Sequence, residues 1–522
     1  MATMRDSCSD DPKASPRTDR EFRLADPPSP SPRQHSHAPL LWIAVGFVGA
    51  CALGAVLAIL ADWRADRRLG SETKRLGGSW QWVLSNDGGG GRALRVGPRP
   101  TKLGAVGERV PGAKELLSSR APATSLYDAL RPDLRYVTAD SWSGEVGQFL
   151  SVLSLIYLAQ ESQRIAIIPS VWRDGEHYGS SKVRMSDLFD MERFRADTGT
   201  LFVEWSDVKP FDSAPSRMKT DEVGCYFANN GFAGGASFGD YLVTPSTWRL
   251  PPSSPSWFSS SLESLLLIDY DLPLRLAQTR QLALESNRTL PRNFQEGSQL
   301  MCYTNVWALG RLGGSAPSGW WEGDYKAFEG LQRVEGGMRD LLHPSLRGTH
   351  PEWWAVGRYI DFTRAIWNVA LLAVRKTLGT ADLPASMLTV HIRHGDFEHW
   401  CPSGHGCVAP LEAYNSAVDE LLKNLPLDTI VLVTTDETSP TFHASLAALG
   451  WCAISHTSLG TAALLQSKYG DASGWYDSAV DQAILSLGRA FVGTLDSQVS
   501  LVSALRVASW NDGETRLVRR QT

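Results

Sequence analysis

The C-terminal part of the chain alternates between short runs of β-forming residues and stretches with helical periodicity, and this alternation restricts the fold more than any other feature. Strands are predicted at 386–392, 429–437, 451–454 and 490–494, and helices at 410–424, 440–450, 478–488 and 496–506. Strands joined through helices pair in parallel, because a crossover connection returns the chain to the same end of the sheet. The pattern therefore predicts a parallel α/β domain at 381–522.

An earlier part of the chain has the same order of elements. A strand is predicted at 134–138, a glycine-containing turn at 141–148, an apolar helix at 149–162 and a strand at 164–171. A long helix that ends at Gly379 closes this region. The Pro-, Ser-, Gly- and Trp-rich segment at about 180–355 has no readable element order. We therefore expect a second α/β domain at 125–380, with the ligand between the domains at the carboxyl ends of the strands.

The N-terminal region predicts a membrane anchor. Residues 1–38 are rich in Pro and Ser and read as a disordered tail. Residues 39–61 carry no charge and as a helix would span about 34 Å, enough for a bilayer core. A signal peptide is the alternative, although its apolar run is usually shorter and nearer the N-terminus. Residues 62–124 read as a stem or linker.

The orientation of this anchor is open from the residues alone. Five basic residues follow it closely and one precedes it, which favours a cytosolic C-terminal part. The sequon at Asn287 favours the opposite orientation, and so do the cysteines beyond the anchor. Cys401 and Cys407 are close enough in sequence to form a disulfide across a short loop. The net charge of −5 over 522 residues gives no indication of a nucleic-acid partner.

Polar residues are concentrated where the strand at 386–392 ends. His391, Arg393, Gly395 and Asp396 lie at the edge of the sheet where parallel α/β domains bind ligands. Gly395 allows a sharp turn, Arg393 suits a phosphate group because its planar fork can hold two oxygens, and Asp396 could hold that arginine in place. An ordinary Arg–Asp surface pair is the alternative.

A metal site is a further alternative at the same place. The segment supplies ligand types that zinc accepts, namely His391, His394, Asp396, His399, Cys401, His405 and Cys407. Their spacing fits no familiar zinc pattern, and Arg393 would lie beside the ion. We therefore favour an anion over a metal and predict no metal site.

The same residues resemble a known family. The segment "HIRHGDF" is similar to the His-x-Arg-x-Gly-Asp motif of the GDP-fucose protein O-fucosyltransferase family. The glycine turn followed by "RIAIIP" resembles the first motif of that family, and "VDQAILSLGRAFVGTLDSQVSL" resembles its last. These segments span most of 132–507 and are most similar to divergent fungal members.

The resemblance implies two Rossmann-like domains in the GT-B arrangement, with the acceptor on the N-terminal side and the GDP-sugar on the C-terminal side. It implies metal-independent, inverting transfer of fucose from GDP-fucose to a hydroxyl group of a protein or glycan. It also implies a single-pass type II membrane protein of the endoplasmic reticulum or Golgi, with residues 39–61 in the membrane and the catalytic part in the lumen.

The resemblance assigns roles to individual residues. Arg393 matches the family arginine on the β-phosphate, where a fixed cation stabilises the charge that develops as the glycosidic bond breaks. His391 matches a histidine beside the nucleotide, Asp396 an acid of the motif, and Asp481 an acid that contacts guanine or ribose.

The last motif implies that Ser497, Gln498 and Ser500 contact the phosphates at the start of a helix. Helix capping is the alternative role for the two serines. The chain departs from the family here, because Ser497-Gln498-Val499 stands where Ser-Ser-Phe is frequent.

The first motif departs from the family as well. Gly147 stands where many members have an asparagine, so that side-chain contact is missing. Glu145 matches a glutamate that in one branch of the family deprotonates the acceptor hydroxyl. A solvated turn residue is the other interpretation of Glu145.

Three other functions remain open from the sequence. The chain could transfer a different GDP-sugar, or bind a nucleotide or glycan without catalysis, which the loss at Gly147 favours. A structural membrane protein with a disulfide-tied ectodomain would leave the two strand–helix series and Arg393 unexplained.

Overall fold

The computed structural model describes residues 109–140, 144–171, 182–210, 220–227, 243–249, 272–295, 299–304, 351–395, 408–495 and 497–518. The expected tail and anchor lie outside these residues, as do most of the stem and most of the middle region. Among the helices of the described ranges, none is long and apolar enough to cross a membrane.

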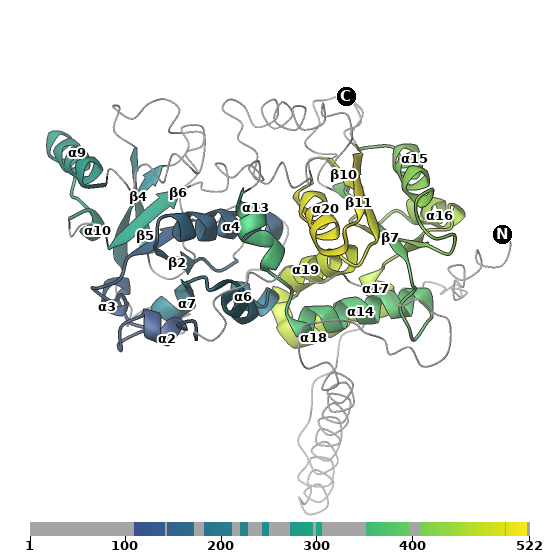
Figure 1. The fold of residues 1–522 in the computed structure, drawn as a ribbon, viewed down its shortest axis with the longest axis horizontal. Helices are drawn as coiled ribbons and strands as arrows, with labels where there is room; N and C mark the ends of the chain where they lie inside the picture. Colours follow the sequence, from purple (N-terminus) through teal and green to yellow (C-terminus); the bar gives the residue numbers. More distant parts are fainter. Residues whose placement is uncertain are drawn as a thin grey trace, which may run out of the picture. The chain divides into compact units, whose positions relative to one another are not determined.

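The first sheet has six strands in the order β3-β2-β1-β6-β4-β5, and each neighbouring pair is parallel (Figure 1). The strands are β1 (Tyr136–Ala139), β2 (Ile165–Ile168), β3 (Phe202–Glu204), β4 (Asp221–Phe227), β5 (Val243–Arg249) and β6 (Leu300–Thr304). The predicted strands at 134–138 and 164–171 correspond to β1 and β2. The strands β3 to β6 come from the region whose element order the sequence did not reveal.

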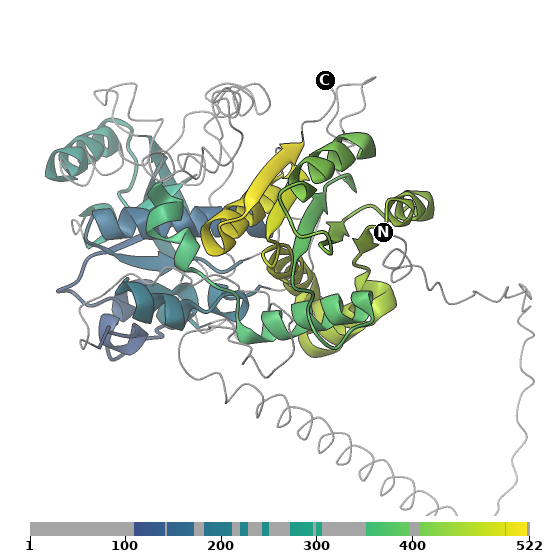
Figure 2. The same ribbon diagram turned by 45° about the vertical axis from the view of Figure 1, so that its right-hand side comes forward.

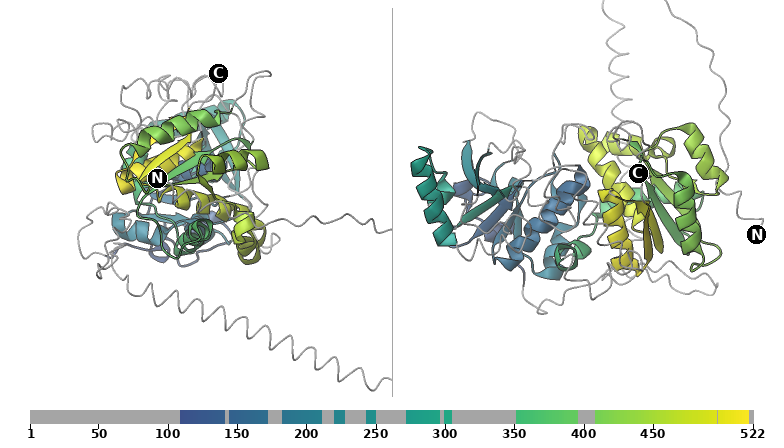
Figure 3. Two further views of the ribbon diagram at one scale, coloured as in Figure 1. Left: turned by 90° about the vertical axis from the view of Figure 1, so that its right-hand side faces the viewer. Right: turned by 90° about the horizontal axis from the view of Figure 1, so that it is seen from above.

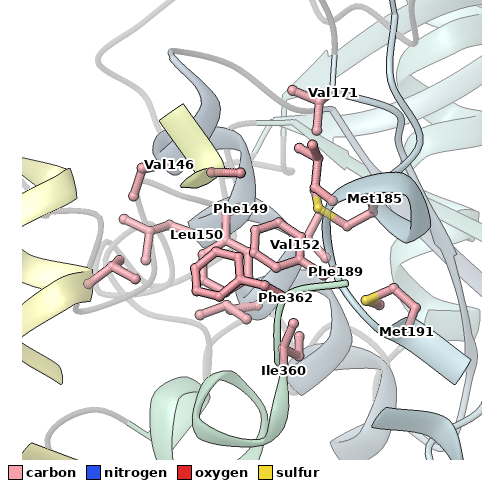
Figure 4. Packing of buried hydrophobic residues seen from close by; sticks show 14 of the residues in the cluster. Val146, Phe149, Leu150, Val152, Val171, Met185, Phe189, Met191, Ile360 and Phe362 are labelled. Atoms are coloured by element: carbon pink, nitrogen blue, oxygen red, sulfur yellow. The ribbon is translucent and has the colours of Figure 1, made fainter. Parts of the chain in front are cut away.

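Helices accompany this sheet along the chain. They are α2 (Ala113–Leu116), α3 (Leu126–Ala129), α4 (Glu145–Glu161), α5 (Met185–Leu188), α6 (Met191–Thr198), α7 (Trp205–Val208), α9 (Leu272–Glu285), α10 (Arg292–Gln295) and α13 (Pro351–Ala355), followed by the 3-10 turn η6 (Gly357–Tyr359). Helix α4 is buried almost all round, as its continuous apolar sequence predicts. Figure 4 shows its residue Phe149 packed with Phe189 and Phe362 in the core.

The folded domain begins before residue 125, so the expected stem is too long at its C-terminal end. Leu116 and Leu117 are buried in a cluster with Trp205. Ser125 then donates a hydrogen bond of 2.6 Å to the Asp221 carboxylate at the start of β4. Apolar burial and this buried hydrogen bond fix the segment to the first sheet, which a flexible linker would not allow.

The second sheet has five parallel strands in the order β11-β10-β7-β8-β9 (Figure 2). They are β7 (Met387–Ile392), β8 (Ile430–Thr435), β9 (Cys452–Ala453), β10 (Ala490–Thr494) and β11 (Glu514–Val518). Four of them confirm the predicted strands, and β11 was not predicted. Two parallel sheets with helical connections confirm the α/β class.

The helices of the second half are α14 (Arg364–Leu378), α15 (Leu411–Leu422), α16 (Pro440–Ala448), α17 (His456–Leu459), α18 (Thr461–Tyr469), the 3-10 turn η8 (Gly470–Ala472), α19 (Ser473–Leu485) and α20 (Gln498–Asn511). Of these, α14, α15, α16, α19 and α20 correspond to predicted helices, whereas α17, α18 and η8 were not predicted. Gly379 ends α14 in the left-handed conformation at φ 63°, as its position predicts. Helix α4 of the first half contacts α20 of the second, and Figure 3 shows them side by side.

A disulfide joins neighbouring strands of the first sheet. Cys225 on β4 and Cys302 on β6 are bonded, with Cα atoms 4.4 Å apart. Cys452 is disulfide-bonded as well. The predicted Cys401–Cys407 bridge lies outside the described residues.

Candidate functional site

The order of the second sheet makes the end of β7 a candidate ligand-binding edge. The strand that follows β7 in the chain is β8 on one side, whereas β10 pairs with β7 on the other side. The chain therefore continues from β7 to β8 on one side and from β10 to β11 on the other. Parallel α/β sheets bind ligands at the carboxyl ends of two such neighbouring strands, here β7 and β10. At this edge the His391 ring contacts Ser500 of α20, and the backbone of His391 and Arg393 is hydrogen-bonded to the Thr494 hydroxyl.

His391 is held as a neutral imidazole. It is 7% exposed, and its Nδ1 lies 2.7 Å from the Ser500 hydroxyl. Burial and the nearby charge of Arg393 lower the pKa of His391 to about 3. The Ser500 hydroxyl accepts the Thr494 N–H at 2.9 Å, so its own proton is left for His391 Nδ1. We infer that His391 carries its proton on Nε2 and can act as a neutral hydrogen-bond donor.

The two serines of the last motif have different structural roles. Ser497 caps α20, since its side chain accepts the Ser500 N–H at 3.3 Å. Ser500 is completely buried and connects His391 to β10. Capping is thus the observed role of Ser497 but not of the Ser500 hydroxyl. Gln498 is the first residue of α20, where backbone N–H groups lack intrahelical partners and favour an anion.

Arg393 is held by an acid that the sequence analysis did not select. Its backbone N–H donates to the Thr494 hydroxyl at 2.8 Å, and its Nη1 donates to Asp436 Oδ2. The other oxygen of Asp436 accepts the His394 N–H at 2.8 Å. Asp396, the acid expected in this role, lies outside the described residues. Asp436 follows β8 directly, so the motif Thr-Thr-Asp-Glu at a strand exit was the available signal.

Gly395 leaves room for the Asp436 carboxylate because it has no side chain. A Cβ atom there would lie 2.2 Å from Asp436 Oδ2, and Gly395 is not among the residues with positive φ. The expected reason for this glycine, a sharp turn that requires its conformational freedom, is therefore replaced by close approach of the Asp436 carboxylate.

His394 extends the same edge. Its Nδ1 lies 3.2 Å from Glu437 Oε2, and its ring centroid lies 4.8 Å from that of Phe442. Its Nε2 is buried and has no hydrogen-bond partner within the described ranges. A buried polar atom of this kind is a candidate contact for a ligand.

Asp481 lies in an ion pair with another side chain. Its carboxylate is 3.0 Å from His456 Nε2, and His456 Nδ1 is 2.8 Å from the Thr461 hydroxyl. Burial lowers the pKa of His456, but the charges of Asp481 and Asp477 and the hydrogen bond that His456 donates to Asp481 outweigh burial and raise it. The His456 contact occupies one oxygen of the Asp481 carboxylate. The expected contact of Asp481 with guanine or ribose stays a prediction.

Glu145 is not a solvated turn residue. It is the first residue of α4, is 1% exposed, and accepts hydrogen bonds from Ser478 and Gln482 of α19. Burial raises its pKa to about 7, against the opposing effects of Ser478, Arg506 and Gln482. A carboxyl group that titrates near neutral pH suits a general base, so this role stays a prediction with the solvated alternative removed.

Other predicted sites fall outside this edge. Asn287, two residues after α9, is exposed and has φ 50°, so it is accessible for modification, and its glycosylation stays a prediction. Within the described ranges, no three His, Cys, Asp or Glu residues are grouped as a metal site would need.

No protein-family model matches the chain, and no curated protein matches it in sequence. Solved structures similar to it include POFUT1 in complex with GDP-fucose, at 13% identity, 74% coverage of this chain, 99% of that chain and a TM-score of 0.43. A mutant of FUT1 from Arabidopsis thaliana in complex with GDP has 13% identity, 72% and 69% coverage and a TM-score of 0.34. Fucosyltransferase NodZ from Bradyrhizobium has 12% identity, 71% and 93% coverage and a TM-score of 0.32.

Proposed function

We propose that the chain is a glycosyltransferase that uses a GDP-sugar, with fucose from GDP-fucose as the transferred group. One observation carries the proposal: at the carboxyl edge of β7 and β10, neutral His391 contacts the first turn of α20, and Arg393 follows at the end of β7, held by Thr494 and Asp436. A fixed guanidinium group and helix N–H groups suit a diphosphate, and the nucleotide and sugar follow from the resemblance of the motifs.

The residues of this edge would act on the leaving group. The acceptor oxygen attacks the anomeric carbon, the bond from that carbon to the β-phosphate oxygen breaks, and the electron pair stays on GDP. Arg393, oriented by Asp436, stabilises the charge on the β-phosphate, and His391 donates a neutral hydrogen bond. Glu145 takes the acceptor proton, and attack opposite to the leaving group inverts the anomeric centre. No metal enters this sequence of steps.

We also propose that this domain works in the lumen of the endoplasmic reticulum or Golgi, behind an anchor at 39–61. The Cys225–Cys302 disulfide supports this location, because disulfides persist in oxidising compartments. An exposed Asn287 supports it too, since glycosylation occurs in the lumen. Sensitivity of the expressed protein to an N-glycosidase, lost in Asn287→Gln, tests the orientation.

Calorimetric titration of the full chain with GDP, GDP-fucose and GDP-mannose, without added metal, tests the donor. Preferential binding of GDP-fucose is expected. Preference for GDP-mannose would replace the donor, and no binding by folded protein would overturn the proposal. The change at Gly147 favours one competing function, a non-catalytic binding protein, and binding without release of the sugar to any acceptor or to water would establish it.

A further inference from the structure

A buried chain of hydrogen bonds links three helices at the junction between the two halves of the structure. Glu145 of α4 accepts hydrogen bonds from Gln482 Nε2 and from the Ser478 hydroxyl at 2.9 Å. Gln482 Oε1 in turn accepts from Arg506 Nη1 of α20 at 2.9 Å. Glu145 is 1% exposed, and Gln482 and Arg506 are completely buried. We call Glu145, Gln482 and Arg506 the buried relay.

Arg506 is unusual because a full positive charge lies among aromatic rings. Its guanidinium carbon is 4.2 Å from the ring centroid of Phe362, 5.2 Å from that of Phe149 and 5.6 Å from that of Trp510. Figure 4 shows Phe149 and Phe362 side by side in this core. Nε and Nη2 have no hydrogen-bond partner within the described ranges. Ring faces offset part of the cost of burying the charge, but an apolar side chain would pack there at less cost.

The position of Arg506 fixes the direction of the whole relay. A guanidinium group only donates hydrogen bonds, so Gln482 must turn its oxygen toward Arg506 and its nitrogen toward Glu145. The nitrogen also donates to the Ser478 carbonyl at 3.3 Å, which uses both of its protons. Glu145 Oε2 therefore faces two donors, and that arrangement favours the ionised carboxylate.

The second oxygen of Glu145 has no such partner. Oε1 is buried and has no hydrogen-bond partner in the part of the chain that the structure describes. Glu145 begins α4, and α4 follows β1, so this oxygen lies near the carboxyl end of the first sheet. The relay thus holds one oxygen and leaves the other for a proton from a bound molecule.

The charge of Arg506 also favours the ionised form of Glu145. Burial raises the pKa of Glu145 to about 7, and Arg506 is the charged group that opposes this rise. Burial lowers the pKa of Arg506 to about 9, so it still carries its charge at neutral pH. Helix α13 also packs on α4 and bears the buried Glu352, which is not among the groups that shift Glu145.

We propose that Gln482 and Arg506 are positioning residues for the transfer reaction, which orient the Glu145 carboxylate and keep it ionised so that it can accept the acceptor's proton. This inference rests on the proposed function. The competing role for the relay is purely structural, as a latch between α4, α19 and α20. The two roles differ in one measurable respect, because a latch has no reason to change the pH dependence of turnover.

The test uses Arg506→Met and Gln482→Met in the full chain, with release of fucose from GDP-fucose to water as the reaction. Methionine keeps apolar contacts with the rings and removes the hydrogen bonds. Arg195→Met is the matched control, since Arg195 is also buried, stacks over Phe202 at 4.1 Å and lies in the first half away from the relay. The carboxyl band of Glu145 in infrared spectra, identified by its loss in Glu145→Gln, reports its protonation without any turnover.

Loss of an opposite charge near a carboxylate raises its pKa by about one unit or more. We expect Arg506→Met to reduce turnover about fivefold at about pH 7 and to recover most of it by about pH 8.5, with a parallel shift of the infrared titration. GDP affinity should not change, and Arg506→Lys should shift the profile less because it keeps the charge. Arg195→Met should leave the profile in place.

An unshifted infrared titration in both methionine variants would overturn the relay. A uniform loss of turnover at every pH would assign the relay to structure alone and overturn the proposal. If Arg506→Met does not fold, Gln482→Met gives the same decision, because it removes the hydrogen bonds of Gln482 with Glu145 and Arg506. Failure of the proposed function would appear in the wild-type protein, which would then neither bind nor turn over any GDP-sugar.

Discussion

Substitution of Gly395 by alanine would test how Asp436 holds Arg393 at the end of β7. The added methyl group would lie 2.2 Å from Asp436 Oδ2 and 3.0 Å from its Cγ, so the carboxylate has to move. That movement breaks its hydrogen bonds with Arg393 Nη1 and with the His394 N–H. Arg393 then loses the contact that orients it, although no charged residue has been changed.

The size of the effect follows from these two bonds. A hydrogen bond to a charged group contributes about 1.5 to 3 kcal/mol. The side chains of Arg393 and Asp436 are 24% and 25% exposed, which places the loss toward the lower end for each bond. We expect Gly395→Ala to weaken GDP binding by about 1.5 to 3 kcal/mol, or roughly tenfold to a hundredfold.

Titration calorimetry with GDP measures this loss, and a double-mutant cycle shows its route. Asp436→Ser removes the carboxylate and with it the steric conflict, so adding Gly395→Ala to that variant should cost little more. Gly112→Ala, whose added Cβ would lie 3.2 Å from a flexible glutamate oxygen far from the site, is the control for a new methyl group. Unchanged GDP affinity in Gly395→Ala would refute the close approach. If Gly395→Ala weakens GDP binding equally in the wild type and in Asp436→Ser, the effect does not act through Asp436.

Three further predictions concern the site and the stability of the fold. Arg393→Ala should keep the fold and lower turnover by about a hundredfold or more, and unchanged turnover would remove Arg393 from the phosphate site. His391 has a pKa of about 3 in the folded protein and about 6.5 when unfolded. The unfolded chain therefore binds an extra proton between those values, and stability should fall as pH drops through this range, by up to about 1.4 kcal/mol per pH unit. Urea unfolding of His391→Gln should show a shallower fall, and an identical pH dependence would contradict the buried neutral imidazole. The Cys225–Cys302 bond spans 77 residues, so replacing both cysteines with serine should lower the free energy of unfolding by about 4 kcal/mol, whereas a loss below about 1 kcal/mol would place the bond outside the stable core.

The amino-acid sequence by itself determined the class of the fold and the strand end that carries the candidate site. The apolar run 165–168 and the segment 387–392, rich in β-forming residues, read as buried parallel strands because such strands are covered on both faces. The placement of Arg393 after such a run then follows, since the carboxyl ends of parallel strands form one edge. The end of α14 at Gly379 was also predictable from the sequence, because it depends only on the local backbone conformation of that glycine.

Contacts between distant segments were decided by the tertiary structure. Asp436 holds Arg393 across 43 positions in the chain, and no local pattern distinguishes it from the nearer Asp396, which suits the same role equally well by sequence. The short strands β3 and β9 and the final β11 depend on their neighbours in the sheet more than on their own periodicity.

Burial made the same difference for Glu145. In sequence it follows a glycine in a polar segment, which fits a solvated turn and a catalytic base equally well. Helix α19, more than three hundred residues later, covers it and supplies Ser478 and Gln482. A pKa depends on desolvation and on neighbouring charges, and both are properties of the packed molecule. The sequence therefore determined which chemical groups the chain carries, and only the tertiary structure decided which of them are neutral, which are charged and which face one another.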